Sequence, residues 1–250
     1  MASSMGQISI TTPATITVDR NKSEQEEALL SKALKEQPRG FVIVIFKSSK
    51  VLYLCKDGRV LRNITVKKSE LDSAFQFLKG TVDDRLNFDF PVPVALGPEA
   101  VGPKARRHDM KTPEGEYFVC QKNGRGESKY SVALAISYPN AADAKNAMAE
   151  GAISRNQYQR IMDKLNAHEC PPASTPLGGG VGIHGLSNRD LEKLKRTSEA
   201  AYRRYLRLDQ PERVRTTARD WTFGCVGLEM AAAYYVFNNT PKNTPIIIYK

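Results

Sequence analysis

The sequence predicts a mainly β protein decorated with helices, of the α+β class. Short runs rich in β-branched and aromatic residues recur along the chain between turn residues, as is typical of strands. Segments with apolar residues at helical spacing lie between these runs. The 250 residues are 41% hydrophobic and contain no internal repeat, low-complexity tract or long linker. One domain with its own core is therefore the simplest architecture.

The N-terminal part is predicted to form a helix followed by an antiparallel meander. Residues 23–37 combine a candidate N-cap, Ser23, with an apolar stripe at helical spacing. Three apolar runs follow, at 41–46, 51–55 and 60–66, and a Lys-Asp-Gly-Arg turn joins the last two.

Two helical insertions are predicted to interrupt the strands. Residues 69–79 have helical spacing and place the first insertion near 67–90. Residues 188–208 have an apolar stripe beneath a strongly basic face, which places the second near 188–217. Further strands are predicted at 115–121, 131–137, 181–184 and 245–249. Further helices are predicted at 143–151, 154–167 and 228–237.

Composition narrows the possible partners and compartments. No apolar run reaches the roughly 18 residues of a membrane-spanning helix, so no transmembrane segment is predicted. Residues 1–17 show no secretory signal, and we interpret 1–38 as a leader and a helix, and 39–250 as the main domain. The net charge of +10 favours a polyanionic partner. Nucleic acid is not predicted, because the basic positions lack interleaved aromatic residues and a groove-reading motif.

A cysteine and a histidine are the strongest candidates for chemistry. A thiol is nucleophilic only when ionised, and its ordinary pKa of about 8.5 must be lowered or the proton taken by a base. Cys225 is predicted where a loop meets a helix N-terminus, and His184 at the end of a strand, which makes a workable dyad. Gly185 follows the histidine and Gly224 precedes the cysteine, where backbone N–H groups can approach a reacting carbonyl.

These residues resemble the catalytic domain of the L,D-transpeptidases, the YkuD domain. That family carries an Ile-His-Gly element and then Ser/Thr-x-Gly-Cys, which residues 183–185 and 222–225 match. Segments 102–104, 112–115, 137–140 and 177–179 look like further parts of the same domain. The resemblance covers residues 41–250 and implies an L,D-transpeptidase-like β-sandwich or barrel.

The resemblance also implies an activity. Cys225 would attack the amide at the L-centre of diaminopimelate in a peptidoglycan stem peptide, expel the terminal D-alanine and form a thioester, with His184 as base and then acid. An amine acceptor would complete a transpeptidase reaction, whereas water would make the chain an L,D-carboxypeptidase. A periplasmic or cell-envelope location is implied, and a carbapenem is a suitable covalent probe.

Other site residues are expected from the same resemblance or lie in the motifs. Gly179 and Gly180 would let substrate approach the backbone near His184, and Thr222 and Phe223 precede the Gly-Cys pair. The residues expected to border the substrate cleft are Tyr130, Ser137, Tyr138 and Asn140. No cofactor or metal is predicted, because His168 and Cys170 lack further ligands at a known spacing.

The chain departs from the family pattern at three places. Phe223 stands where a second histidine often lines the oxyanion pocket, and Gly227 replaces a polar residue. Cys225 follows His184 by 41 positions, about twice the usual separation, and the basic segment 188–208 accounts for the excess. We interpret that segment as a candidate wall or lid of the cleft for an anionic polymer.

Several alternatives remain open from the sequence. A hydrolase that releases wall-attached protein uses the same dyad, and an inactive peptidoglycan-binding module would account for Phe223 but not for a retained thiol and base. Cys55 and Cys120 are expected in the core, and a disulfide involving Cys170 is possible in an oxidising compartment.

Overall fold

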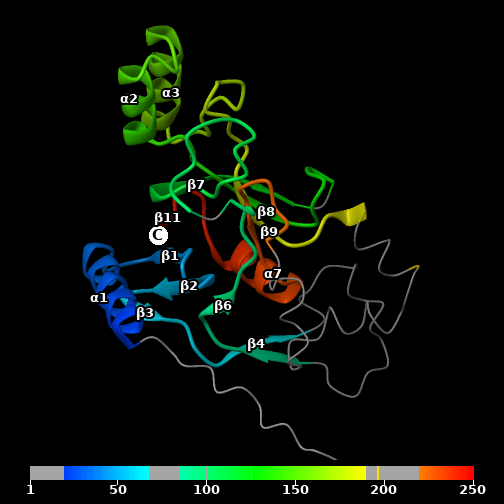
Figure 1. The fold of residues 1–250 in the computed structure, drawn as a ribbon. Helices are drawn as coiled ribbons and strands as arrows, with labels where there is room; N and C mark the ends of the chain where they lie inside the picture. Colours follow the sequence, from blue (N-terminus) through cyan, green and yellow to red (C-terminus); the bar gives the residue numbers. More distant parts are fainter. Residues whose placement is uncertain (1–19, 68–84, 100, 125, 190–195, 197–219) are drawn as a thin grey trace, which may run out of the picture.

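A nine-stranded mixed sheet forms the body of the protein (Figure 1). The computed structural model describes residues 20–67, 85–99, 101–124, 126–189, 196 and 220–250. The strand order is β10-β9-β8-β7-β11-β1-β2-β3, β6 also pairs with β2, and β4 and β5 form a separate pair. The predicted mainly β fold with helices is confirmed.

The elements have the following bounds. The strands are β1 (Phe41–Phe46), β2 (Val51–Lys56), β3 (Arg59–Val60), β4 (Ile64–Lys67), β5 (Arg85–Phe88), β6 (Val92–Pro93), β7 (Gly115–Asn123), β8 (Ala133–Ile136), β9 (Gly182–His184), β10 (Val226–Gly227) and β11 (Pro245–Tyr249). The helices are α1 (Arg20–Glu36), α2 (Ala141–Ala149), α3 (Arg155–Asn166) and α7 (Met230–Asn239).

Strand β1 lies inside the sheet and is covered on both faces. Its sequence is apolar at every position, as expected for a strand with no solvent face. Val42 and Val44 pack in one cluster with Ala33 of α1, whereas Ile43 and Ile45 belong to the cluster that contains α7. Helices α1 and α7 therefore cover opposite faces of the sheet, and the side chains of β1 alternate between them.

The third strand of the predicted meander is interrupted. Residues 60–66 were expected to form one strand, but they divide between β3, which pairs with β2, and β4, which pairs with β5. Asn63 adopts a φ of +53° at the division, and its N–H donates to the carboxylate of Asp89. This left-handed residue ends one pairing and allows the chain to begin the other.

Helices α2 and α3 begin with capping boxes that the sequence encodes. Asn140 accepts a hydrogen bond from Asp143 N, and Ser154 accepts one from Gln157 N. The two helices pack on a small separate cluster that includes Ile153 and Ile161. They lie away from the sheet in Figure 1.

Some predictions fall on segments that the structure does not describe. The helix at 69–79 lies wholly outside the described residues, and of 188–208 only 188, 189 and 196 are described. Across the described ranges, no helix combines the length and the apolar character needed to span a membrane.

Candidate active site

His184 is the last residue of β9, and its imidazole is buried. Strand β9 lies between β8 and β10, with His184 opposite Ala133 on one side and Gly227 on the other. The backbone oxygen of His184 accepts a hydrogen bond from Leu228 N at 2.8 Å. The ring is only 1% exposed, so the sheet fixes its backbone on both sides and the protein interior surrounds its side chain.

The hydrogen bond of the imidazole determines where its proton lies. Nδ1 is 2.6 Å from the carbonyl oxygen of Gly185. A carbonyl can only accept a hydrogen bond, so Nδ1 must carry the proton. Within the described part of the chain Nε2 has no hydrogen-bond partner. In the neutral ring Nε2 therefore carries no proton. This nitrogen can accept a proton as a general base.

Burial keeps this imidazole neutral. It lowers the pKa of His184 to about 4, the bond to Gly185 acts in the opposite direction, and the positive charge of Lys129 lowers it further. Near pH 7 His184 is therefore available as a proton acceptor.

Cys225 lies beside the start of β9. Val226 pairs with Ile183 and Gly227 with His184 in parallel register, so Cys225 lies one position before the pairing begins. Its half-buried Sγ is 3.9 Å from the oxygen of Gly180. The thiol thus comes from the residue just before β10, and the imidazole comes from the neighbouring strand β9. In this state the thiol contacts Gly180, and Nε2 is unpaired among the described residues.

The predicted helix N-terminus at Cys225 is wrong. The residues after Cys225 form β10, and α7 begins only at Met230. Burial raises the pKa of the Cys225 thiol, although a hydrogen bond with Gly182 and the charges of Lys129 and Lys104 lower it. The thiol and the imidazole are therefore both neutral, and no helix dipole activates the thiol.

A hydroxyl fixes the turn that carries Cys225. Thr222 Oγ1 donates to Cys225 O at 2.7 Å and accepts from Gly224 N at 3.2 Å. Thr222 is 4% exposed, so its hydroxyl acts on the backbone of the turn. Phe223, between these residues, is 72% exposed.

Gly224 is required by both conformation and space. Its φ is +110°, and a Cβ at this position would lie 2.4 Å from Lys111 O. Gly224→Ala should therefore lower the free energy of unfolding by about 3 kcal/mol, from strain and collision together. Gly126→Ala is the matched control, because Gly126 has a φ of +87° but open space around its Cα. In urea unfolding, the control should lose about 1 kcal/mol of the free energy of unfolding. Equal losses in the two variants would show that the protein relieves the collision at position 224.

Gly185 has a packing role that the sequence did not indicate, and the expected role of its N–H at a reacting carbonyl stays a prediction. A Cβ there would lie 2.3 Å from Sδ of Met230, the first residue of α7. Because Gly185 has no side chain, α7 can pack close to β9. The carbonyl oxygen of Gly185 accepts a hydrogen bond from Nδ1 of His184.

The structure brings some of the other predicted site residues to the dyad. The ring of Tyr130 stacks on His184 with centroids 3.5 Å apart, and Gly180 contacts Sγ of Cys225. Gly179, just before it, packs closely on Ala173.

Three predicted substrate residues have side chains engaged within the protein. Ser137 Oγ accepts from Phe118 N at 2.9 Å, and the hydroxyl of buried Tyr138 donates to Lys104 O at 3.2 Å. Asn140 caps α2. These hydrogen bonds are with residues other than Cys225 and His184, so the role of the three residues at substrate stays a prediction.

Sequence reasoning missed Trp221. Its ring meets His184 edge-on with centroids 5.8 Å apart and an interplanar angle of 65°. The available signal was that the one tryptophan of the chain lies four positions before Cys225. Within the residues described, no group of three or more His, Cys, Asp or Glu side chains is arranged to hold a metal ion.

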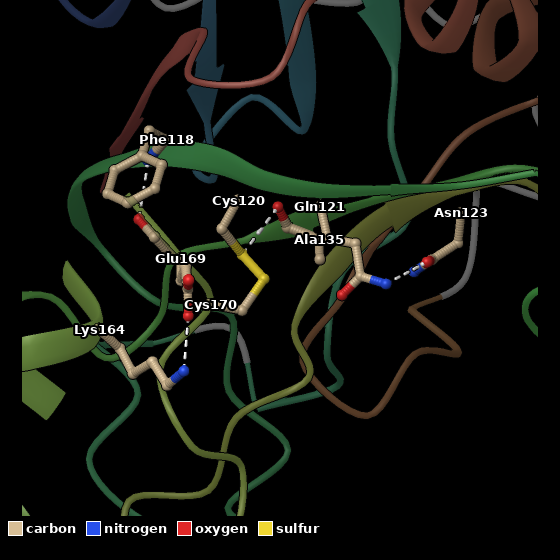
Figure 2. The surroundings of a disulfide bond; sticks show 9 residues. Phe118, Cys120, Gln121, Asn123, Ala135, Lys164, Glu169 and Cys170 are labelled. Atoms are coloured by element: carbon tan, nitrogen blue, oxygen red, sulfur yellow. Dashed lines mark hydrogen bonds and ion pairs between the residues drawn. A yellow bond between two sulfur atoms is a disulfide. The ribbon is translucent and has the colours of Figure 1, made fainter. Parts of the chain in front are cut away.

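A disulfide ties the loop that leads to the site. Cys120 of β7 is bonded to Cys170, and Figure 2 shows this link beside Ala135 of β8. The chain then runs from Cys170 to Gly180, whose oxygen contacts the Cys225 thiol. The sequence left the pairing open, and Cys55 is free and buried.

Comparisons with known proteins give the family. The model of the L,D-transpeptidase catalytic domain (YkuD) matches residues 40–248. No curated protein matches significantly.

Several solved structures are similar at low identity. The helical cell shape determining protein Pgp2 from Campylobacter jejuni is 16% identical, with a TM-score of 0.42, over 89% of this chain and 54% of that one. An L,D-transpeptidase from Xylanimonas cellulosilytica is 14% identical, with a TM-score of 0.38, over 84% of this chain and 61% of that one. L,D-transpeptidase 3 from Mycobacterium tuberculosis is 13% identical, with the same TM-score and the same two coverages.

This chain therefore spans between about half and three-fifths of the length of the structures that it resembles. The family match covers residues 40–248, which include both the His184 and the Cys225 elements and nearly all of the sheet. The protein belongs to the L,D-transpeptidase catalytic domain family, as its motifs predicted.

Proposed function

We propose that the protein is a peptidoglycan L,D-transpeptidase in which Cys225 is the nucleophile and His184 the general base. The observation that carries this proposal is the imidazole geometry. Nδ1 is tied to Gly185 O, and the bare Nε2 lies on the strand that neighbours the cysteine. A binding module needs neither a free thiol nor a base held in one tautomer.

The first half of the proposed reaction forms a thioester. Sγ of Cys225 leaves Gly180 O and approaches Nε2, a contact that catalytic dyads often tighten only with substrate bound. Nε2 takes the thiol proton as sulfur attacks the carbonyl carbon at the L-centre of diaminopimelate. The C–N bond then breaks, and Nε2–H gives its proton to the departing amino group of D-alanine.

The second half transfers the acyl group. An amine of a second stem peptide attacks the thioester carbonyl and gives its proton to Nε2. The C–S bond breaks, and the proton returns to sulfur. Water in place of the amine would yield a shortened stem peptide, as in an L,D-carboxypeptidase.

The negative charge of the tetrahedral intermediate needs a donor. Gly224 N–H donates to Thr222 Oγ1, so we propose the N–H of Cys225 as the principal oxyanion donor. Phe223, with its exposed ring next to the nucleophile, takes the place of the family's second histidine and supplies contact area for the stem peptide. Lys129 adds positive charge beside the dyad.

The disulfide supports a location in the cell envelope. Disulfides persist in oxidising compartments such as the periplasm, and Cys120 and Cys170 form one. Peptidoglycan stem peptides, the expected partner, occur in the same compartment. We infer that residues 39–250 form the catalytic domain and that α1 packs on it through Ala33.

Analysis of digested sacculi tests the proposed function. The purified protein is incubated with sacculi, which are then digested and analysed by mass spectrometry, with Cys225→Ala as the control. New crosslinked dimers that depend on Cys225 are expected. Shortened monomers that depend on Cys225, or release of an attached protein, would show that the acceptor is water and not an amine. Binding of sacculi with no product would overturn the enzymatic proposal in favour of a binding module.

A further inference from the structure

The indole of Trp221 occupies the place that a side chain at position 227 would take. A Cβ at Gly227 would lie only 2.8 Å from Cζ2 of Trp221. Gly227 pairs with His184 across β10 and β9, so the space above it adjoins the imidazole. The absence of a side chain at one position thus allows a large aromatic ring from another to contact the base.

Two aromatic rings contact the imidazole. Tyr130 stacks on it with centroids 3.5 Å apart and an interplanar angle of 16°, and Trp221 meets it edge-on. Tyr130 is itself held by a backbone bridge to Ser187. With its Nδ1 bonded to Gly185, the ring has little freedom to turn about its Cβ–Cγ bond.

The residues on both sides of Trp221 are hydrogen-bonded to the backbone of one residue, Leu96. Asp220 Oδ1 accepts from Leu96 N at 3.0 Å, and Thr222 N donates to Leu96 O at 3.2 Å. The carboxylate of Asp220 also forms an ion pair with Lys50 at 2.6 Å.

A second anchor fixes the glycine beneath the indole. Ala95 N donates to Gly227 O at 2.9 Å, and Gly227 N donates to Ala95 O at 2.7 Å. Residues 95–96 therefore hold both the neighbours of Trp221 and the glycine below its indole, so hydrogen bonds on both sides define the position of Trp221 against His184.

Ring orientation matters because it decides which nitrogen carries the proton. A neutral imidazole free in water favours the proton on Nε2, and only a hydrogen bond to Nδ1 reverses that preference. If the ring could turn away from Gly185 O, the proton would move to Nε2, and that atom could no longer accept the thiol proton.

We infer that Trp221 is a positioning residue: together with Tyr130 it holds the imidazole of His184 in the orientation that donates Nδ1–H to Gly185 O. The effect of Trp221 on catalysis rests on the proposed function, in which Nε2 acts as the general base. Gly227 is part of the same arrangement, because the absence of its side chain leaves the space that the indole occupies.

Nitrogen-15 NMR of the full chain tests the inference without any substrate. The three histidines of the chain give few imidazole signals, and His184→Gln assigns one set. In the unaltered protein at pH 7, His184 should show a protonated Nδ1 and a bare Nε2. In Trp221→Leu and in Gly227→Ala, where the new Cβ displaces the indole, this signature should be lost and Nε2–H should appear. Trp221→Phe should restore it in part.

Tyr53→Leu is the matched control. The rings of Tyr53 and Phe46 also meet edge-on, with centroids 5.8 Å apart, but they lie in the cluster beneath α1. This variant should lose comparable packing and keep the Nδ1–H signature. Thioester formation with a carbapenem should slow about 10²-fold in Trp221→Leu and not in the control.

The tautomer and the reaction are separate readouts. An unchanged Nδ1–H signature in both folded Trp221→Leu and Gly227→Ala would overturn the inference, as would equal loss in Tyr53→Leu. If Trp221→Leu fails to fold, Gly227→Ala and Trp221→Phe decide. If the signature depends on Trp221 but the unaltered protein forms no acyl-enzyme and no peptidoglycan product, the positioning stands and the proposed function fails.

Discussion

Replacing His184 with glutamine should slow acylation of Cys225 by about 10²–10⁴-fold, the usual contribution of a positioned general base. The glutamine amide keeps an uncharged polar side chain with an N–H donor at this position. It cannot take a proton from the thiol, and burial raises the pKa of Cys225, so few thiolates form spontaneously. Intact-mass measurement of the carbapenem adduct over time gives the rate.

His168→Gln is the matched control, because His168 also packs against an aromatic ring, that of Phe118 with centroids 5.6 Å apart. Its acylation rate should equal that of the unaltered protein. Cys225→Ala should give no adduct at all. An adduct that forms as fast in His184→Gln as in the unaltered protein would show that His184 is not the base.

The unaltered protein and His184→Gln should also differ in how the acylation rate depends on pH. Burial places the pKa of His184 at about 4, so Nε2 is bare above that pH and protonated below it. Acylation should therefore keep its rate as pH falls from 7 to 5 and decline as pH passes through about 4. His184→Gln should lack this acidic decline. An inflection near 6.5, the ordinary pKa of histidine, would mean that the imidazole is more hydrated than its 1% exposure implies.

Elements whose pattern is purely local could be predicted from the sequence. The apolar run of β1 identifies a strand covered on both faces, and Ser154 with Gln157 identifies the start of α3. Both signals depend on a few neighbouring residues. The interruption at Asn63 could not be predicted in this way, because the hydrogen bond to Asp89 joins residues 26 positions apart.

The sequence could name candidate site residues from short motifs, but it could not give their local structure. The Gly-flanked Cys225 and His184 were readable as short motifs, whereas the helix N-terminus at Cys225 was a wrong prediction. Val226 and Gly227 form β10 only because they pair in parallel with Ile183 and His184, and no local pattern reveals that partner. Trp221 was missed for the same reason, since its contact with the imidazole follows from the register of β9 and β10.

Removing the Cys120–Cys170 disulfide should lower the free energy of unfolding by about 4 kcal/mol, the loop-closure value for residues about 50 positions apart. The bond restricts the unfolded chain, and in the folded protein it joins β7 to the loop that reaches Gly180 (Figure 2). The double variant Cys120→Ser/Cys170→Ser is compared with the unaltered protein by urea unfolding. Cys55→Ser is the control for loss of a thiol, because Cys55 is buried and free.

The position of the disulfide predicts an effect on the reaction as well. Gly180 O contacts the Cys225 thiol, and Gly182 pairs with β8 only two residues later. Pairing with β8 holds β9 and His184 in place without the disulfide, so the tautomer of the base should persist in the double variant. The loop between Cys170 and Gly180 loses its covalent link to β7 with the bond, so acylation by a carbapenem should slow even where the protein is still folded. If unfolding becomes easier but the acylation rate of the folded protein is unchanged, the disulfide stabilises the fold alone, and the loop keeps its place at the thiol through the hydrogen bonds that Arg107 donates to Pro176 O and Ala173 O.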